Sequence, residues 1–229
     1  MKLYLMQLGS ATGGSPVPGY LIQTDDGRNI LVDSGYPQDR YGEGGAYPAD
    51  SWIVTRLAQI GLTPDDIDMV VCTHMDHDHA GSHDHFPNAE FVVQDEHLKA
   101  AREMPRFQSI REHWDNPQLN YRTVSGDTEL VPGVELIGTS GHVPGHQSVL
   151  VRLPQTGPVL LAIDAIPHNF DGFTPETRPT GTFDNDVEGT RRSTRKLVDL
   201  AEREGVTLMI YGHDTERWQP LKKMPEYYE

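Results

Sequence analysis

The chain opens with short segments in which apolar and polar residues alternate. Residues 2–8 alternate cleanly, residues 19–23 do so less cleanly, and residues 29–33 follow a polar turn at residues 25–27. A period of two is typical of half-buried strands, and the Asp-Gly pair in the turn favours a hairpin. The pattern therefore predicts a β-sheet at the start of the chain, with a hairpin across Asp26 and Gly27.

Apolar residues then recur at helical spacing in several segments, namely residues 49–60, 95–103, 107–114 and 187–204. The first of these segments stops at Gly61, a residue type that commonly terminates helices. Apolar runs bounded by turn residues predict strands between and after the helices. These strands are expected at residues 68–72, 89–94, 129–131, 134–139, 148–153, 159–163 and 206–211.

The order of these elements indicates the fold class. Strands come first, helices and strands alternate, and further strands with a helix follow, which predicts an α/β protein with two β-rich halves and helices outside, an αββα sandwich. Periodicity alone leaves other α/β arrangements open. A chain of 229 residues with 36% hydrophobic residues can bury a substantial core. We expect one domain over residues 1–229.

Charge and cysteine content argue against several classes of function. A formal net charge of −15 disfavours nucleic acids and anionic membranes as partners. The single cysteine, Cys72, cannot form an intramolecular disulfide, and its place in an apolar run predicts packing rather than catalysis. We see no signal peptide and no stretch approaching ~20 apolar residues. We therefore expect a cytoplasmic protein.

A dense group of imidazoles and carboxylates follows the predicted strand 68–72. It contains His74, Asp76, His77, Asp78 and His79. Neutral imidazole and carboxylate are the ligands that bind Zn²⁺ and similar divalent ions. Alternate side chains of a loop that leaves a buried strand can point into one cavity, and one ion can hardly take all of these groups. The spacing suggests two ions, and we disfavour a solvated polar loop because the group caps an apolar strand.

Polar residues also end three later strands. The glycine-punctuated segment 139–148 contains His142 and His146, Asp164 follows the strand 159–163, and His213 follows the strand 206–211. Glycine beside a ligand lets the backbone approach a metal centre closely. Each feature alone is weak evidence. Together they supply further imidazoles and a carboxylate able to bridge two ions.

The order of these motifs, a histidine cluster followed by Gly-His-Val-Pro-Gly-His, Ile-Asp-Ala and Gly-His-Asp, resembles the metallo-β-lactamase superfamily. Residues 131–148, 161–165, 212–214 and 225–227 are most similar to the N-acyl homoserine lactone lactonases, and the resemblance runs from Leu31 to the end of the chain. It implies the metallo-β-lactamase fold and two metal ions. Carried over by position, the first ion is expected on His74, Asp76 and His142, the second on Asp78, His79 and His213, with Asp164 bridging them.

The chain departs from the family pattern at two positions. The pattern His-x-His-x-Asp-His has a second histidine where this chain has Asp76, with His77 beside it as an alternative ligand. A carboxylate is a harder ligand, which makes manganese or iron more plausible there. The family's substrate-contacting tyrosine, three residues after the bridging aspartate, is Pro167 here. The adjacent His168 is a candidate replacement, and a solvent-exposed loop residue is the alternative.

Other polar residues are expected to support the metal centre or to pack elsewhere. Asp33 resembles the family's buried aspartate that orients the metal loop, in either a structural or a functional role. His146 is expected to hydrogen-bond behind the ligands rather than to bind metal. His83 and His85 are expected to be surface or packing residues.

These expectations combine into a binuclear metal-dependent hydrolase that opens a lactone or related ester. Two divalent ions lower the pKa of a shared water from 15.7 toward about 7, and the bridging hydroxide would attack the carbonyl carbon. Asp78 would pass the proton to the leaving alkoxide. We expect zinc, with manganese, iron or cobalt as alternatives. The loop 168–185 is expected to cover the site, and the loop 36–48 to form a homodimer contact or a lip for the substrate.

Rival activities stay open at this point because one fold hosts several. They are a phosphotriesterase, a general carboxylesterase, a thioesterase of the glyoxalase II kind and a β-lactamase. The last two are disfavoured, because the chain stops soon after His213 and because no export signal is seen. A non-hydrolytic diiron redox module is the alternative from a different class, although such modules usually depend on a flavin domain.

Overall fold

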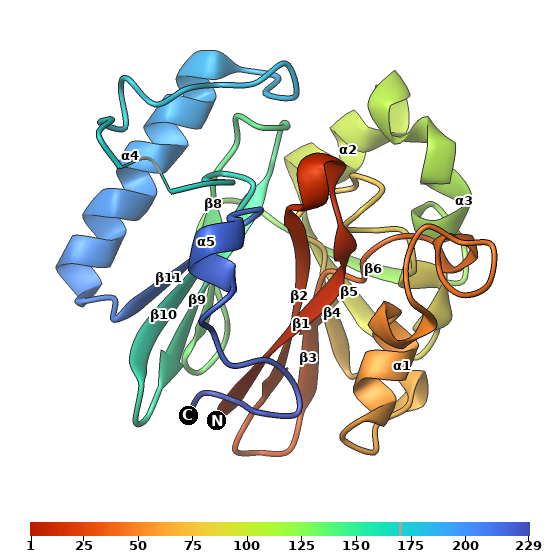
Figure 1. The fold of residues 1–229 in the computed structure, drawn as a ribbon. Coiled ribbons are helices and arrows are strands. Elements are labelled where there is room, and N and C mark those ends of the chain that lie inside the picture. Colours follow the sequence, from red (N-terminus) through yellow and green to blue (C-terminus); the bar gives the residue numbers. More distant parts are fainter. Residues whose placement is uncertain (170) are drawn as a thin grey trace.

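Two β-sheets face each other and carry helices on their outer sides (Figure 1). The computed structural model describes residues 1–169 and 171–229. The first sheet has the order β1-β2-β3-β4-β5-β6, with β1 (Lys2–Ser10), β2 (Pro16–Gln23), β3 (Asn29–Val32), β4 (Met69–Val71), β5 (Glu90–Gln94) and β6 (Asn120–Val124). The second has the order β11-β10-β9-β8-β7, with β7 (Thr128–Val131), β8 (Val134–Gly138), β9 (Gln147–Leu153), β10 (Gly157–Ile163) and β11 (Leu208–Tyr211).

Strand direction changes within each sheet. The first three strands pair antiparallel, and the predicted hairpin joins β2 to β3, whereas β3 to β6 pair in parallel. In the second sheet only β10 and β11 pair in parallel. The carboxyl ends of parallel neighbours lie at the same edge of a sheet. The loops that follow β3 and β4 therefore begin at the same edge of the first sheet, and the loops that follow β10 and β11 begin at the same edge of the second.

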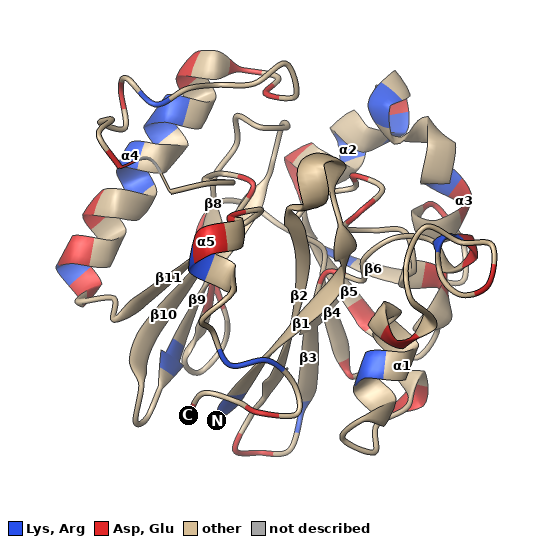
Figure 2. Ribbon diagram, in the orientation of Figure 1, with Lys and Arg blue, Asp and Glu red and all other residues tan. Residues whose placement is uncertain are grey.

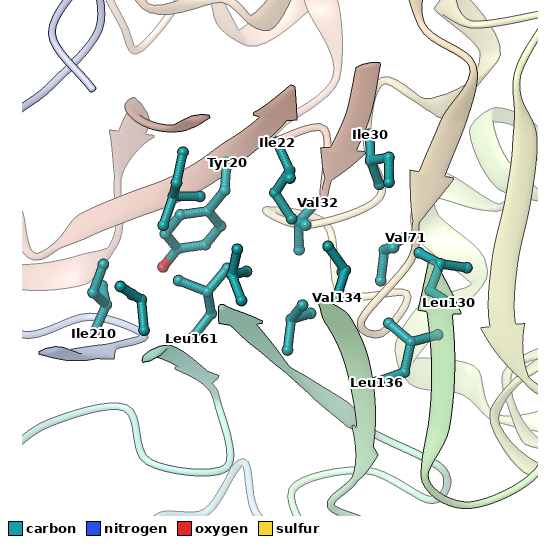
Figure 3. Packing of buried hydrophobic residues seen from close by; sticks show 14 of the residues in the cluster. Tyr20, Ile22, Ile30, Val32, Val71, Leu130, Val134, Leu136, Leu161 and Ile210 are labelled. Atoms are coloured by element: carbon teal, nitrogen blue, oxygen red, sulfur yellow. The ribbon is translucent and has the colours of Figure 1, made fainter. Parts of the chain in front are cut away.

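Alternation along the strands builds the core between the sheets (Figure 3). Ile22 and Val32 of the first sheet point toward the second, whereas their neighbours Leu21 and Leu31 join a separate cluster that includes Leu57 of α1 (Ile53–Ala58). The inner cluster includes Tyr20, Ile22, Ile30, Val32, Val71, Val134, Leu136, Leu161 and Ile210, all at most 2% exposed. Each such aliphatic side chain contributes about 1.5–3 kcal/mol on burial.

Helices cover the outer faces and complete the αββα order predicted from the sequence. They are α1 (Ile53–Ala58), α2 (Asp95–Glu103), α3 (Arg111–Trp114), α4 (Val187–Glu204) and α5 (Thr215–Trp218). The bounds of α2 and α4 agree with the predicted segments. Buried Leu197 and Leu200 pack α4 on the second sheet, while Figure 2 shows acidic and basic residues along its length. In the described part of the chain, no helix is long and apolar enough to cross a membrane.

Some elements differ from the sequence prediction. The helix expected over 49–60 is broken at Trp52, whose extended backbone (φ −65°, ψ 140°) separates a short 3-10 turn from α1. The segment 107–114 begins as 3-10 turns over Pro105–Ile110 before α3. Strand β6 was not predicted, because its residues are exposed or half-buried at the sheet edge and lack an apolar face. The single-turn helix α5 is too short for a periodic pattern.

Candidate metal centre

Loops from both sheets meet above the carboxyl ends of their strands. The loop after β4 carries the histidine cluster, and it is preceded by Cys72, which packs in a buried apolar cluster as predicted. The loop between β8 and β9 carries His142. Asp164 directly follows β10, and His213 lies two residues after β11. The structure thus brings together side chains that lie up to 139 residues apart, from His74 to His213.

The first ligand group consists of His74, Asp76 and His142. Asp76 Oδ2 lies 3.2 Å from His74 Nε2 and 3.3 Å from His142 Nε2. Two ligands that each lie about 2.1 Å from a tetrahedral ion are separated by roughly 3.4 Å. The three donor atoms therefore have the spacing of ligands around one ion, and all lie within 4.8 Å of one another.

The second ligand group consists of Asp78, His79 and His213, whose donor atoms also lie within 4.8 Å of one another. Asp78 Oδ2 lies 3.9 Å from His79 Nε2 and 3.8 Å from His213 Nε2. These distances are longer than in the first group, but each still allows one cation between the two atoms.

Asp164 lies between the two groups, with one oxygen toward each. Its Oδ2 lies 3.4 Å from His142 Nε2 and 3.7 Å from His74 Nε2. Its Oδ1 lies 3.3 Å from His213 Nε2 and 3.8 Å from His79 Nε2. This is the placement that a carboxylate bridging two ions requires.

Hydrogen bonds behind the histidines fix which ring nitrogen faces the centre. His79 Nδ1 donates to Asp33 Oδ2 at 2.8 Å, and His213 Nδ1 donates to the Pro16 carbonyl at 2.8 Å. His142 Nδ1 donates to Asp184 Oδ1 at 3.1 Å. With Nδ1 engaged behind each ring, Nε2 is the nitrogen that faces the centre and could bind a metal ion, as in metal-binding histidines.

Asp33 organises the loop after β4 from below. It is fully buried, it accepts hydrogen bonds from the Thr73 amide (2.9 Å) and hydroxyl (2.7 Å), and it also accepts from His79. The Thr73 hydroxyl in turn lies 3.0 Å from His74 Nδ1, so one carboxylate orients a histidine of each group. Asp33 has a left-handed backbone (φ 59°), a conformation that aspartate tolerates better than most residues.

The residues present fit a pair of cations. Within the described residues, His74 Nε2, His79 Nε2 and Asp164 Oδ1 are buried and have no hydrogen-bond partner. A buried polar atom without a partner costs about 1–3 kcal/mol. Bound ions would satisfy all three atoms, which gives the physical reason for this arrangement.

The charges around the centre also favour the binding of cations. Burial alone would lower the pKa of His79, but the charges of Asp78, Asp164 and Asp33 outweigh it and raise that pKa to about 10. Burial of His213 is likewise outweighed, mainly by Asp164, which raises its pKa to about 9. The carboxylates therefore create a strongly negative potential that attracts cations, here protons and, when bound, metal ions.

Three further predicted residues lie around the ligand groups rather than in them. His77 is 52% exposed at its side chain and packs against Tyr36 with the two rings tilted (5.2 Å between ring centroids), so Asp76 and not His77 joins the first group. His146 is buried, hydrogen-bonds Thr139 through Nδ1 (2.8 Å) and packs 5.0 Å from the His74 ring. His168 is exposed.

The remaining histidines of the cluster region pack against aromatic rings. His83 is fully buried and lies 5.0 Å from the Phe91 ring, and His85 contacts Trp52 edge-on at 5.1 Å. For both residues the packing alternative given by the sequence agrees with the structure.

Two residues near the centre were missed from the sequence. Arg106 donates to both oxygens of Asp76 and lies 2.9 Å from His142 Nε2. His97 accepts a hydrogen bond from the Met75 amide (2.8 Å) and donates to the Pro144 carbonyl (2.7 Å), so it ties together the two loops of the first group. The position of His97 on the apolar face of a predicted helix was the available signal.

The fold and the paired ligand groups define a protein that can hold two metal ions at one edge of two facing sheets. The family model of the metallo-beta-lactamase superfamily matches residues 12–213, and the chain belongs to this superfamily.

Relatives of known name are similar over nearly the whole chain. An N-acyl homoserine lactonase from a Bacillus species is 35% identical over 225 residues, 93% of this chain and 86% of that protein. The N-acyl homoserine lactonase AttM of Azorhizobium caulinodans is 34% identical and covers 100% of this chain and 94% of its own. A solved structure of a B. thuringiensis AiiA variant, with N-decanoyl-L-homoserine bound at the active site, has a TM-score of 0.86 at 31% identity and covers 99% of this chain and 98% of its own.

Proposed function

We propose that this protein hydrolyses the lactone ring of N-acyl homoserine lactones or closely related lactones, using two divalent metal ions. The observation that carries the proposal is the placement of Asp164 between two histidine-carboxylate groups, 3.3 Å from His213 and 3.4 Å from His142. The relatives named N-acyl homoserine lactonases at 34–35% identity support the substrate class.

In this proposal, some residues bind the metal ions and others orient the ligands. His74, Asp76 and His142 hold one ion, Asp78, His79 and His213 hold the other, and Asp164 is shared. When bound, two such ions supply a nucleophilic water at neutral pH and polarise the carbonyl of the ring. Asp33 keeps the imidazoles turned toward the centre, and Asp78 passes a proton to the alkoxide oxygen released by ring opening.

His168 is proposed to contact the substrate from the mouth of the site. Its neighbours are tied to the second ligand group, because Pro167 accepts from the His213 amide (2.6 Å) and the Asn169 amide donates to Asp214 (2.7 Å). These bonds hold the backbone on either side of His168 next to His213 and Asp214, and His168 itself is exposed. An imidazole there can donate a hydrogen bond to a carbonyl oxygen, the role of the tyrosine that Pro167 replaces in the family pattern.

Zinc is the proposed metal because imidazole and carboxylate ligands at this spacing suit it. The additional carboxylate, Asp76, shifts the first group toward harder ions, so manganese, iron and cobalt belong in the same test.

The test is a hydrolysis screen over homoserine lactones, simple lactones, aryl esters and phosphotriesters, with zinc, manganese, iron and cobalt each supplied to metal-free protein. We expect lactone opening that depends on added ions. Activity on aryl esters or phosphotriesters alone would replace the proposal with a general esterase or a phosphotriesterase. Iron with oxygen consumption and without hydrolysis would replace it with a redox module, and full activity in stripped protein would refute it.

A further inference from the structure

A guanidinium occupies part of the first ligand group. Arg106 Nε donates to Asp76 Oδ1 at 2.6 Å, and its Nη2 donates to Asp76 Oδ2, so the fork holds both oxygens of the carboxylate. The same Nη2 lies 2.9 Å from His142 Nε2. A guanidinium has no acceptor, so this nitrogen donates to the lone pair that His142 turns toward the centre.

Further hydrogen bonds and partial burial hold the Arg106 side chain in place. Its Nη1 donates to the Phe183 carbonyl, and the next residue, Asp184, accepts from His142 Nδ1. Only 24% of the Arg106 side chain is exposed. The arginine therefore joins the first ligand group to the segment that contains Phe183 and Asp184.

The second ligand group has no such cation. Among the contacts of the described residues, no lysine or arginine lies within ion-pair distance of Asp78, and His79 Nε2 is buried without a partner. In the first group, by contrast, two of three donor atoms already face a positive charge. A divalent ion arriving there meets a guanidinium fixed on two of its donor atoms, whereas no lysine or arginine of the described residues is fixed on the donor atoms of the second group.

We propose that Arg106 is an internal cation that competes with a metal ion for the first ligand group. The second group fills first and tightly. The first group takes its ion only when the guanidinium leaves His142 and one oxygen of Asp76. The inference rests on the proposed function for the assignment of the two groups as metal sites, and it adds the order and the inequality of their loading.

Titration of chelator-stripped protein with Zn²⁺ and with Mn²⁺, followed by calorimetry, tests the proposal without any substrate. We expect two binding steps in the wild type, the second weaker by about 10-fold or more, equivalent to 1.4 kcal/mol. Arg106→Gln should strengthen the weaker step by about 10-fold and leave the stronger step within roughly twofold. Arg106→Lys keeps the charge but cannot form the fork, so its weaker step should lie between the two.

Arg102→Gln is the matched control, because Arg102 pairs with Asp115 at 3.1 Å instead of contacting a ligand group. It should leave both steps unchanged. Thermal unfolding of the stripped variants verifies that each is folded, and the lysine variant carries the test if the glutamine variant is not. Two equal steps in the wild type, or a weaker step that Arg106→Gln leaves unchanged or weakens, overturn the inference but not the proposed function. A wild type that binds no divalent ion overturns both.

Discussion

The two ligand groups occupy equivalent places in the fold but are supported differently. The first is assembled from two loops that His97 ties together, and Arg106 already pairs with its carboxylate. The second takes two neighbours from one loop and His213 from the end of β11, and His213 is held by a backbone carbonyl. The comparison teaches that two similar sets of imidazole and carboxylate donors can differ in their surroundings, because one set is already paired with a guanidinium and the other is not.

Replacing Asp164, which faces both ligand groups, should affect the two groups equally. Asp164→Asn removes the charge that lies within 3.8 Å of a histidine nitrogen in each group. We expect kcat/KM for lactone opening to fall by roughly 1000-fold, about 4 kcal/mol, together with loss of both ions. Kinetics and elemental analysis measure the two losses. Asp199→Asn, at an exposed position on α4, is the control, and retention of two ions by the Asp164 variant would show that the residue does not bridge.

Substitutions confined to one group should separate the two. His79→Ala deprives the second group of its unpartnered nitrogen and should lower kcat/KM by about 100-fold or more. Asp76→Asn keeps an oxygen ligand and frees Arg106 from a full ion pair, so a loss of about 10-fold is expected. Circular dichroism establishes that both variants fold. A larger loss in Asp76→Asn than in His79→Ala would contradict the expectation that the tightly filled second group contributes more to turnover.

The two adjacent residues Asp78 and His79 were easier to predict than the residues that reach the centre from later strand ends. Asp78 and His79 are adjacent in a dense polar run after an apolar strand, so local sequence was enough to propose them. His142, Asp164 and His213 were weak signals singly, and only their order along the chain made them recognisable. Their meeting in space confirms the arrangement of strand ends, although their role as metal ligands remains a proposal.

Elements whose apolar residues form one buried face were predicted from the sequence, and elements without such a face were missed. The long helix α4 has a clear apolar face and was placed to the residue, whereas β6 is an exposed edge strand whose pairing with β5 has no local signature. Arg106 was missed for a related reason. Its function depends on a carboxylate 30 residues away, and no spacing rule within its own segment indicates that contact.

Substitutions at Asp33 and at its partner Thr73 should affect the two ligand groups to different degrees. Asp33→Asn keeps the shape and suits the left-handed backbone, but it weakens the acceptors used by Thr73 and His79. We expect the affinity for the tightly bound ion to fall by roughly 10–100-fold, the usual range for partners of metal-binding histidines. Thr73→Val removes the hydroxyl that links Asp33 to His74 but leaves the hydrogen bond between His79 and Asp33, so it should weaken mainly the first group. An equal effect of both variants on both ions would mean that the loop acts as one rigid unit.

The last expected effect concerns stability rather than catalysis, and it involves only the loops of the first group. His97 joins the Met75 amide to the Pro144 carbonyl, and no counterpart joins the loops of the second group in the described part of the chain. Burial lowers the pKa of His97 from 6.5 to about 4. The folded state thus keeps this imidazole neutral between pH 6.5 and 4, while the unfolded chain takes up a proton.

It follows that His97 favours folding fully above pH 6.5 and progressively less as the pH falls toward 4, by at most about 3 kcal/mol over that interval. His97→Gln cannot titrate, so the wild-type free energy of unfolding should fall more steeply with acid than that of the variant. Urea unfolding of metal-free protein at a series of pH values measures the difference. Parallel curves would show that the imidazole is not held neutral, and a variant that loses the tightly bound ion rather than the weaker one would place His97 behind the wrong ligand group.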